Sequence, residues 1–193
     1  MTDPFDQFAE WFREAEVAVP VDPNAMVLST VGPDGRPSSR VVLLKGFDRE
    51  GFVFYGNLES RKFRELRANP WGALNFHWKP LEKQVRIEGR VAQVSDQEAD
   101  AYFVTRPRGS QIGAWASRQS EPLASRAVLE AAVREVEARY AGREVPRPPD
   151  WSGFRLNPDR IEFWKSAPFR LHDREVFRRA SDDAPWTVER LYP

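Results

Sequence analysis

The sequence predicts a mainly β fold (α+β), a β-barrel with peripheral helices. Short runs rich in β-branched and aromatic residues recur along the chain, and tight turn sequences separate the early ones. Helical periodicity is confined to a few segments, and no repeated strand–helix–strand unit is visible. The sequence contains neither a G-x-G-x-x-G motif nor a P-loop, so a dinucleotide held in the usual way is not expected.

The composition limits the chemistry that the protein can perform by itself. The 193 residues include 29 Lys+Arg and 29 Asp+Glu, so the net charge of zero gives no argument for a nucleic-acid or membrane partner. Cysteine is absent and His77 and His172 are the only histidines, which excludes disulfides, thiolate sites and a three-histidine metal centre. No secretory signal or membrane-length apolar run is visible, so a soluble cytoplasmic protein is expected.

The elements can be predicted in chain order. Asp3-Pro4 is typical of a helix start, and Pro20 and Pro23 end that helix. Two strands, Met26–Val31 and Ser38–Lys45, flank the turn Gly32–Gly35 and predict a hairpin. The further strands expected are Phe52–Tyr55 after a turn at Asp48–Gly51, Trp71–Trp78, Gln84–Val94, Arg160–Lys165, Phe169–Arg178 and Trp186–Leu191.

Three later helices are expected, within one domain. They are Ser60–Ala68, Asp96–Thr105 and Leu123–Tyr140, the last being the longest. Gln111–Trp115 and Gln119-Ser120 are predicted to form a polar loop, which is a weak signal for binding. The single unit over residues 1–193 then comprises a lead-in helix (1–20), barrel strands (22–94), a helical insertion (95–142) and C-terminal strands (151–193).

The first candidate binding feature is Ser60-Arg61-Lys62, at the start of a short helix. Two cations in the first turn face the positive end of the helix macrodipole, which costs roughly 0.3–1 kcal/mol per charge on an exposed helix. A bound anion would contact both side chains and the free backbone N–H groups. The alternative is a solvated charged helix, because Arg64 and Arg67 continue the same pattern.

The second feature is the predicted strand Arg40–Lys45, in which apolar residues lie between two cations. Alternation places Arg40 and Lys45 on opposite faces of the strand. If the strand is buried on both faces, the two charges require a ligand. The alternative is that both ends of the strand reach solvent.

The third feature combines donors suited to a phosphate. Tyr102 and Arg106 share one face of a predicted helix, and Ser110 follows just beyond Pro107. A surface Tyr–Arg stack would produce the same spacing.

The fourth feature is a group of donors on the predicted strand Phe169–Arg178. Arg170, His172 and Arg174 would share one face, with Leu171 toward the core. Adjacent cations repel one another unless an anion or an electron-rich ligand compensates, although an edge-strand charge ladder would show the same pattern.

Taken in this order, the segments resemble the pyridoxine/pyridoxamine 5′-phosphate oxidase family. Each motif is weak alone, but their order and spacing are specific, from about Asp22 to the C-terminus. The matching stretches are Asp22–Met26, Arg40–Lys45, Phe54-Tyr55, Ser60–Lys62, Leu81–Val85, Tyr102-Phe103, Ser110–Trp115, Gln119-Ser120, Trp151–Arg155, Ile161–Trp164 and Arg170–Arg174.

The resemblance implies an FMN-binding split β-barrel that forms a homodimer, with FMN at the subunit interface. It implies oxidation of pyridoxine or pyridoxamine 5′-phosphate to pyridoxal 5′-phosphate in vitamin B6 biosynthesis and salvage. Dioxygen would be the acceptor, hydrogen peroxide would be released, and ammonia would leave from the amine. The partners implied are the substrate, dioxygen and a second copy of the chain, with no nucleic acid and no membrane.

The resemblance also implies roles for individual positions. Arg170 and His172 are expected beside the pyridine ring as catalytic residues, and the substrate is expected on Lys45, Tyr102, Arg106, Ser110, Arg170, Leu171 and His172. The flavin positions implied are Arg40, Val41, Val42, Leu43, Leu44, Lys45, Tyr55, Gly56, Arg61, Lys62, Gln84, Gln119, Ser120, Trp164 and Arg174.

Two departures from the family pattern are visible. Gly56 stands where many members carry a hydroxyl residue, so one hydrogen bond to the flavin is expected to be missing. Longer members also carry a basic, tyrosine-containing segment ahead of the first helix that can cover the substrate. Here the helix begins at Pro4, and a lid from that segment is not expected.

Two other interpretations remain at this point. A split-barrel flavin-binding reductase, or a flavin-binding protein without B6 activity, would keep Arg61 and Lys62. It would not need Tyr102, Arg106, Ser110 and the Arg170/His172 pair, and the presence of all of these favours the oxidase. The other interpretation is a nucleic-acid-binding barrel. The sequence has no excess of basic residues, which argues against it.

Overall fold

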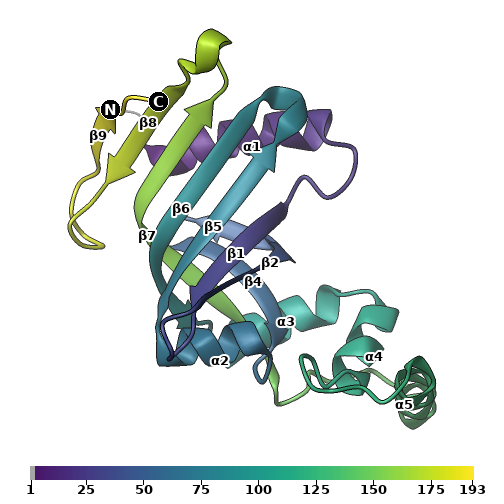
Figure 1. Cartoon of the computed structure of the whole chain (residues 1–193). Coiled ribbons are helices and arrows are strands. Elements are labelled where there is room, and N and C mark those ends of the chain that lie inside the picture. The colour runs from purple at the N-terminus through teal and green to yellow at the C-terminus, as the bar shows by residue number, and fades with distance from the viewer. Residues whose placement is uncertain (1–2) are drawn as a thin grey trace.

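The structure is a computed structural model and describes residues 3–193 (Figure 1). Residues 1–2, which begin the predicted single unit, lie outside the described residues. Nine antiparallel strands form one sheet in the order β2-β1-β5-β6-β7-β4-β3, with β8 paired to β7 and β9 to β8. The strands are β1 (Ala25–Val31), β2 (Pro37–Leu43), β3 (Gly46–Asp48), β4 (Gly51–Asn57), β5 (Trp71–Trp78), β6 (Lys83–Gln93), β7 (Trp151–Lys165), β8 (Asp173–Arg178) and β9 (Thr187–Arg190).

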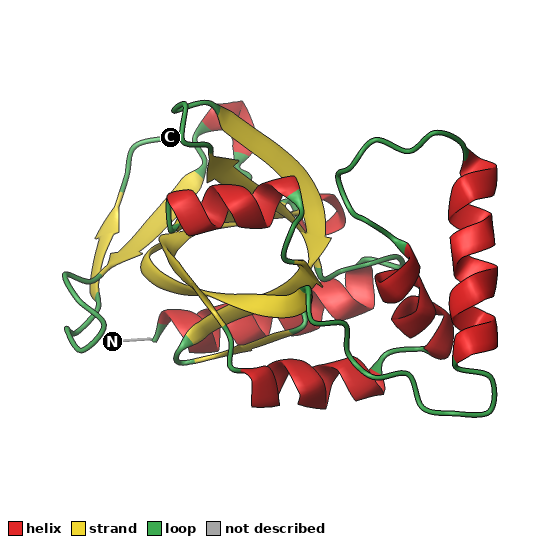
Figure 2. Cartoon of the chain, turned by 90° about the horizontal axis from the view of Figure 1, so that it is seen from below, coloured by secondary structure: helices red, strands yellow, loops and turns green. Residues whose placement is uncertain are grey.

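The helices lie around this sheet, which curls into an open barrel (Figure 2). α2 lies at the lower end of the strands in Figure 1, and α4 and α5 stand to one side of the barrel. No helix within residues 3–193 is long and apolar enough to cross a membrane. The curled nine-stranded sheet with helices around it confirms the prediction of a mainly β barrel with peripheral helices. The helices are α1 (Pro4–Ala18), α2 (Arg61–Ala68), α3 (Asp96–Thr105), α4 (Arg108–Ala116) and α5 (Arg126–Arg139), with 3-10 turns at Lys79–Leu81 and Pro168–Arg170.

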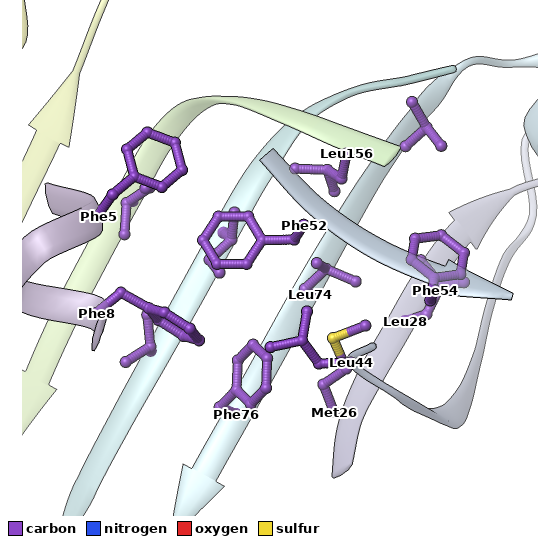
Figure 3. Close-up of a cluster of buried hydrophobic side chains, with 14 of the residues drawn as sticks. Phe5, Phe8, Met26, Leu28, Leu44, Phe52, Phe54, Leu74, Phe76 and Leu156 are labelled. Atoms are coloured by element: carbon purple, nitrogen blue, oxygen red, sulfur yellow. The ribbon is translucent and has the colours of Figure 1, made fainter. Parts of the chain in front are cut away.

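α1 begins where the sequence predicts. The Asp3 carboxylate accepts a hydrogen bond of 2.8 Å from the backbone N–H of Phe5, and Pro4 occupies the first turn. Phe5 and Phe8 are buried and point toward Phe52 of β4 and Phe76 of β5 (Figure 3). The apolar face of α1 is thereby part of the barrel core.

The predicted hairpin is confirmed, and the structure shows the environment of its second strand. β1 and β2 pair with Val31 opposite Pro37, so the turn spans residues 32–36. β2 is the last strand of the sheet path, and Val41 on it is 66% exposed. Of the two interpretations of this strand, the structure supports the one in which it is not buried on both faces, because no residue of β2 is fully buried.

β7 is the main difference among the strands. The prediction began it at Arg160, yet it runs from Trp151 through Pro158. Pro158 lacks a backbone N–H and cannot complete a regular ladder. The register of β6 against β7 shifts between Glu88 and Gly89, directly opposite this proline, so a bulge accommodates it.

Three other predictions are wrong in detail. The segment Gln111–Trp115 is helical, within α4, and is not a loop. α5 has 14 residues, so the 15-residue α1 is longer. A short strand, β3, pairs with β4 before the turn at Asp48–Gly51 and was not predicted.

The C-terminal strand begins later than predicted, which changes the fourth candidate feature. Residues 168–170 form a 3-10 turn in which Phe169 and Arg170 have φ of 58° and 63°. β8 begins only at Asp173. Arg170 and His172 therefore do not share a strand face with Arg174, because the left-handed backbone at two successive residues is incompatible with an extended strand.

Candidate active site

A cavity of about 1050 Å³ opens beside the barrel, between β2, β4 and the helices α2, α3 and α4. Its size is at the upper end for small-molecule sites. Its lining contains five cationic residues and no Asp or Glu, which favours an anionic ligand. The lining residues are Ser38, Ser39, Arg40, Val41, Val42, Leu43, Lys45, Tyr55, Gly56, Asn57, Arg61, Lys62, Tyr102, Thr105, Arg106, Pro107, Ser110, Gly113, Ala114, Ser117, Gln119, Ser120 and Trp151.

The start of α2 forms one side of this cavity. Ser60 is the N-cap residue, but its side chain accepts no capping hydrogen bond, and the first turn holds no acidic residue. The backbone N–H of Arg61 donates to Ser120 Oγ at 3.3 Å. The predicted placement of two cations at the positive end of a helix is confirmed, and the site has the polarity that an anion requires.

Lys62 is the cation with the most unusual surroundings. It is only 7% exposed, and its Nζ donates to Ser60 Oγ and to Gln119 Oε1, both at 3.0 Å. No carboxylate within residues 3–193 forms an ion pair with it. Burial and the nearby charge of Arg40 lower the pKa of Lys62 to about 8. A buried ammonium that contacts only neutral oxygens would be stabilised by an anion.

Gly56 leaves the space that Lys62 occupies. A Cβ at this position would lie 3.3 Å from Lys62 Nζ and 3.0 Å from a ring carbon of Phe63. A hydroxyl residue in its place would need Lys62 or Phe63 to move. The departure from the family pattern at Gly56 thus coincides with a close approach of the lysine.

Glu65 organises two of the other cations, and sequence reasoning missed it. Its carboxylate is 5% exposed and accepts from Arg61 Nε at 2.8 Å and from Arg40 Nη2 at 3.3 Å. Thr30 Oγ1 and Ser38 Oγ donate to it at 2.5 and 2.6 Å. Burial would raise the pKa of Glu65, but these hydrogen bonds outweigh burial and lower it to about 2. The spacing of Arg61 and Glu65, four apart on a helix, was the available signal.

The four residues predicted to bind a substrate phosphate line the same cavity. Tyr102 lies on α3, Arg106 ends that helix, Ser110 lies on α4, and Lys45 lies between β2 and β3. Arg106 Nη1 is buried and has no hydrogen-bond partner among the described residues. The guanidinium carbon of Arg106 lies 4.7 Å from the ring centroid of Trp151. An unpaired donor in this position has the chemistry that a phosphate oxygen would satisfy.

Aromatic rings form the wall beneath these donors. The ring centroids of Tyr55 and Tyr102 are 4.1 Å apart with an interplanar angle of 22°, and Trp151 stacks on Tyr55 at 5.3 Å. Burial raises the pKa of Tyr55 to about 12, so its phenol stays neutral. Trp151 lay in a motif noted from the sequence but was not assigned to the site, and Asn57 gave no signal at all.

The remaining predicted residues do not line this cavity. Leu44 is buried in the barrel core, and its backbone carbonyl accepts from Asn24 Nδ2. Gln84, Trp164 and Arg174 lie side by side on β6, β7 and β8. Arg170, Leu171 and His172 precede β8 in the turn beside them.

This second group has its own buried carboxylate. Glu162 is 1% exposed and accepts from Arg174 Nε at 2.8 Å and from Arg160 Nη2 at 2.6 Å, and it also pairs with Arg86. Burial would raise the pKa of Glu162, but hydrogen bonds from the three guanidiniums outweigh it and lower the pKa to about 2. Arg174 is therefore held in place by protein contacts.

His172 is oriented by its neighbours. Its ring centroid lies 4.6 Å from that of Trp164, and Nδ1 accepts a hydrogen bond of 3.2 Å from the backbone N–H of Ala167. A neutral ring in this position carries its proton on Nε2.

The two groups lie near opposite ends of β7. Trp151, in the cavity wall, and Trp164, in the second group, are 13 positions apart on that strand. At about 3.3 Å per residue the strand path between them is roughly 40 Å. The second group does not contribute to the lining of the cavity in its own chain.

Comparison with known proteins gives concordant results. Residues 12–140 match the family model described as pyridoxamine 5′-phosphate oxidase, and residues 151–193 match the pyridoxine 5′-phosphate oxidase C-terminal dimerisation region. Curated pyridoxine/pyridoxamine 5′-phosphate oxidases from Myxococcus xanthus (strain DK1622) and Rhodopseudomonas palustris (strain TIE-1) are 64% and 60% identical. Each match covers 99% of this chain, and 92% and 90% of the respective relative.

Solved structures share the fold. PhzG from Burkholderia lata 383, crystallised with tetrahydrophenazine-1-carboxylic acid, aligns with a TM-score of 0.93 and 33% identity, over 100% of this chain and 94% of that one. A pyridoxamine 5′-phosphate oxidase-related, FMN-binding protein from Nostoc punctiforme PCC 73102 aligns with a TM-score of 0.80 and 16% identity, over 100% of both chains. The second likeness supports the fold alone.

Proposed function

The chain belongs to the pyridoxine/pyridoxamine 5′-phosphate oxidase family and is an oxidoreductase, and from this premise we propose the reaction that it performs. It oxidises pyridoxine or pyridoxamine 5′-phosphate to pyridoxal 5′-phosphate, with dioxygen as acceptor and hydrogen peroxide as the second product. When the substrate is the amine, oxidation gives an imine, and its hydrolysis by water supplies the aldehyde oxygen and releases ammonia. The observation that carries the proposal is a single cavity that gathers five cations without a carboxylate in its lining.

The cofactor is FMN, and the residues present fit it. The flavin phosphate would be held at the start of α2 by Lys62 and Arg61, with Gln119 and Ser120 beside them. Lys62 has no anionic partner among the described residues, which supports this assignment. Bound there, FMN would supply the hydride-accepting chemistry and the route for electrons to dioxygen, which the side chains of the protein do not provide.

The substrate phosphate lies on Lys45, Tyr102, Arg106 and Ser110. The buried, unpartnered Nη1 of Arg106 supports this position. The guanidinium carbon lies over the Trp151 ring at 4.7 Å from its centroid, and this contact would limit the movement of the guanidinium. By binding the phosphate, these four residues would therefore orient the substrate ring.

The second group of residues completes the site of a partner copy. The C-terminal dimerisation region spans residues 151–193, which include Trp164, Arg170, His172 and Arg174. These residues lie about 40 Å along β7 from the cavity of their own chain. In a homodimer with a two-fold axis, the second group of one chain can face the cavity of the other, and two equivalent sites result.

Arg170 and His172 position the reacting end of the substrate. Oxidation removes a hydride from the carbon that bears the alcohol or amine, and a proton from the oxygen or nitrogen. A planar guanidinium can lie over the ring and hydrogen-bond that heteroatom, while the Nε2–H of His172 can donate to the ring hydroxyl. Their contribution is orientation and charge stabilisation at near-attack distance.

The test compares phosphorylated and unphosphorylated substrates. The protein reconstituted with FMN is supplied with pyridoxine 5′-phosphate, pyridoxamine 5′-phosphate or pyridoxine, and pyridoxal 5′-phosphate and hydrogen peroxide are measured. We expect kcat/KM for pyridoxine to be lower by about 10²-fold or more, because the phosphate donors are left unpaired. Equal rates for the two forms would contradict the phosphate site. Bound flavin with no oxidation of any of the three would favour a flavin-binding protein without B6 activity.

Two arginines near the same helix junction give a matched pair of variants. R106A should raise KM for pyridoxine 5′-phosphate by more than about tenfold and leave flavin content intact, because one charge-assisted contact is lost. R108A is the control. The Arg108 guanidinium donates to the carbonyls of Tyr140 and Arg143 and does not line the cavity.

A further inference from the structure

Gly153 on β7 lies directly across from Tyr55 on β4 in the antiparallel ladder. A Cβ at Gly153 would lie 2.5 and 2.6 Å from two ring carbons of Tyr55, Cε1 and Cδ1. Real side chains do not approach so closely, so the ring could not keep its position. Gly153 is not among the glycines with positive φ. Position 153 therefore requires glycine because the Tyr55 ring occupies the space that a Cβ would need, and not because of the backbone conformation.

The position of Tyr55 matters because another ring rests on it. Tyr102 stacks on Tyr55 with centroids 4.1 Å apart, and Trp151 stacks on it at 5.3 Å. Tyr55 cannot retreat from a new Cβ without disturbing one of these rings. Tyr102 and Arg106 are carried by the end of the same helix, α3, so a displaced Tyr102 would move both donors relative to Lys45 on the barrel.

We propose that Gly153 is a positioning residue: by having no side chain it lets the Tyr55 ring lie flat on β7, and this sets where α3 presents Tyr102 and Arg106 to the substrate phosphate. The effect on substrate binding rests on the proposed function, because it requires that Tyr102 and Arg106 bind the substrate phosphate. The packing of Tyr55 against Gly153 does not depend on that function. The backbone of Gly153 has a separate task, since its carbonyl accepts from the N–H of Val94 at 3.0 Å. Alanine would keep that bond and add only the Cβ.

The experiment is a double-mutant cycle between Gly153→Ala and Tyr55→Ala. In the otherwise wild-type protein, Gly153→Ala should raise KM for pyridoxine 5′-phosphate by about tenfold, because a shift of a fraction of an ångström in the donors weakens binding. It should also change the near-ultraviolet circular dichroism of the cofactor-free protein, which reports on stacked aromatic rings. In the Tyr55→Ala background, Gly153→Ala should change neither quantity further, since the clash has been removed.

The control for an added methyl group in a strand is Gly72→Ala. Gly72 lies on β5, outside the cavity lining, where a Cβ would contact Val91 at 3.2 Å. This variant should lose some stability but keep the parent KM and dichroism. Measuring flavin affinity in each variant separates loss of cofactor from loss of substrate binding.

Each outcome is decisive. An effect of Gly153→Ala that is equally large with and without Tyr55, or no effect at all, overturns the proposal. If Gly153→Ala alone fails to fold, folding of the double variant supports the clash with Tyr55, and failure of both variants overturns it. If the dichroism shows the coupling while no B6 vitamer is oxidised, the proposed function fails and the packing role of Gly153 stands.

Discussion

Lys62 combines burial and a positive charge with hydrogen bonds to neutral oxygens, and it has no ion-pair partner among residues 3–193. Its Nζ is held by Ser60 Oγ and Gln119 Oε1 at 3.0 Å, and Gly56 leaves the room for it. Burial lowers the pKa of Lys62 to about 8, so its charge is marginal near neutral pH in the absence of a ligand. The residue is therefore suited to bind an anion that restores the favourable environment of the ammonium.

Flavin affinity should depend on the protonation of Lys62. An anionic ligand binds the charged form better, so the Kd for FMN should be lowest between about pH 7 and pH 8, where the phosphate is dianionic, and should rise as the pH passes through about 8. K62M should bind FMN more weakly and should lose this rise, as measured by quenching of flavin fluorescence. K79M, which removes an exposed lysine from the turn after β5, is the control and should behave like the parent. A rise that persists in K62M would assign the dependence to another group.

At the scale of secondary structure, Glu65 ties α2 to the β1–β2 hairpin. Its carboxylate on α2 accepts from Thr30 on β1 and from Ser38 and Arg40 on β2. The same carboxylate holds Arg61 in the first turn of α2 at 2.8 Å. This contact explains how a helix that begins with two cations is stable before any ligand binds.

The Glu65 contact should be visible in stability at acid pH. The pKa of Glu65 is about 2 in the folded protein, against an ordinary 4.5, so its contribution is fully present above pH 4.5 and is lost as the pH falls toward 2. E65Q should lower the free energy of unfolding by about 3 kcal/mol at pH 7, because Arg40 and Arg61 lose their buried partner. Its deficit relative to the parent should shrink over that pH window.

Glu59 provides the matched control for Glu65. Its carboxylate pairs with Arg67 near the same helix, but both side chains are about half exposed. E59Q should change the free energy of unfolding by less than about 1 kcal/mol in denaturant titrations. Similar losses in E59Q and E65Q would mean that burial of the carboxylate is not what makes the contact strong.

At the scale of the whole molecule, the chain exposes apolar side chains beside the second group of site residues, which lies at the C-terminal end of β7 and in the turn before β8. Phe169 is 92% exposed and Leu171 is 67% exposed, on either side of Arg170. The turn that carries them is strained, with two successive residues at positive φ. Exposed apolar groups on a fixed turn are typical of an interface. The family assignment of residues 151–193 as a dimerisation region agrees with this.

A mixed dimer tests whether two chains share each site. In a heterodimer of R106A with R170L, a shared site concentrates both defects in one cavity and leaves the other intact, so about half of the wild-type activity is expected. A heterodimer of wild type with the double variant R106A/R170L should then be almost inactive, because each cavity contains one defect. Differently tagged chains and steady-state assays of the purified heterodimers provide the measurement. If each chain formed its own complete site, the two results would be reversed.

Much of the fold was predictable because local chemistry decided it. Asp3 and Pro4 start α1, the turn after Val31 closes the first hairpin, and β5 runs from Trp71 to Trp78 as predicted. These elements depend on caps, turn residues and β-branched or aromatic runs, which act over a few positions. β7 was harder to predict, because Pro158 ends a strand by local rules and only a bulge in β7 at Asp159, next to this proline, allows the strand to continue.

The sequence by itself determined the family, the barrel with peripheral helices, and most of the residues that line the cavity, since Ser60–Lys62 and Tyr102–Ser110 carry their chemistry in local spacing. Only the tertiary structure decided that Glu65 holds Arg40 and Arg61, that Gly153 lies beneath Tyr55, and that Arg170 lies in a turn. It also decided that the two groups of site residues lie far apart along β7. The physical reason is that burial, cross-strand contact and backbone strain depend on residues distant in the chain, which no local pattern records.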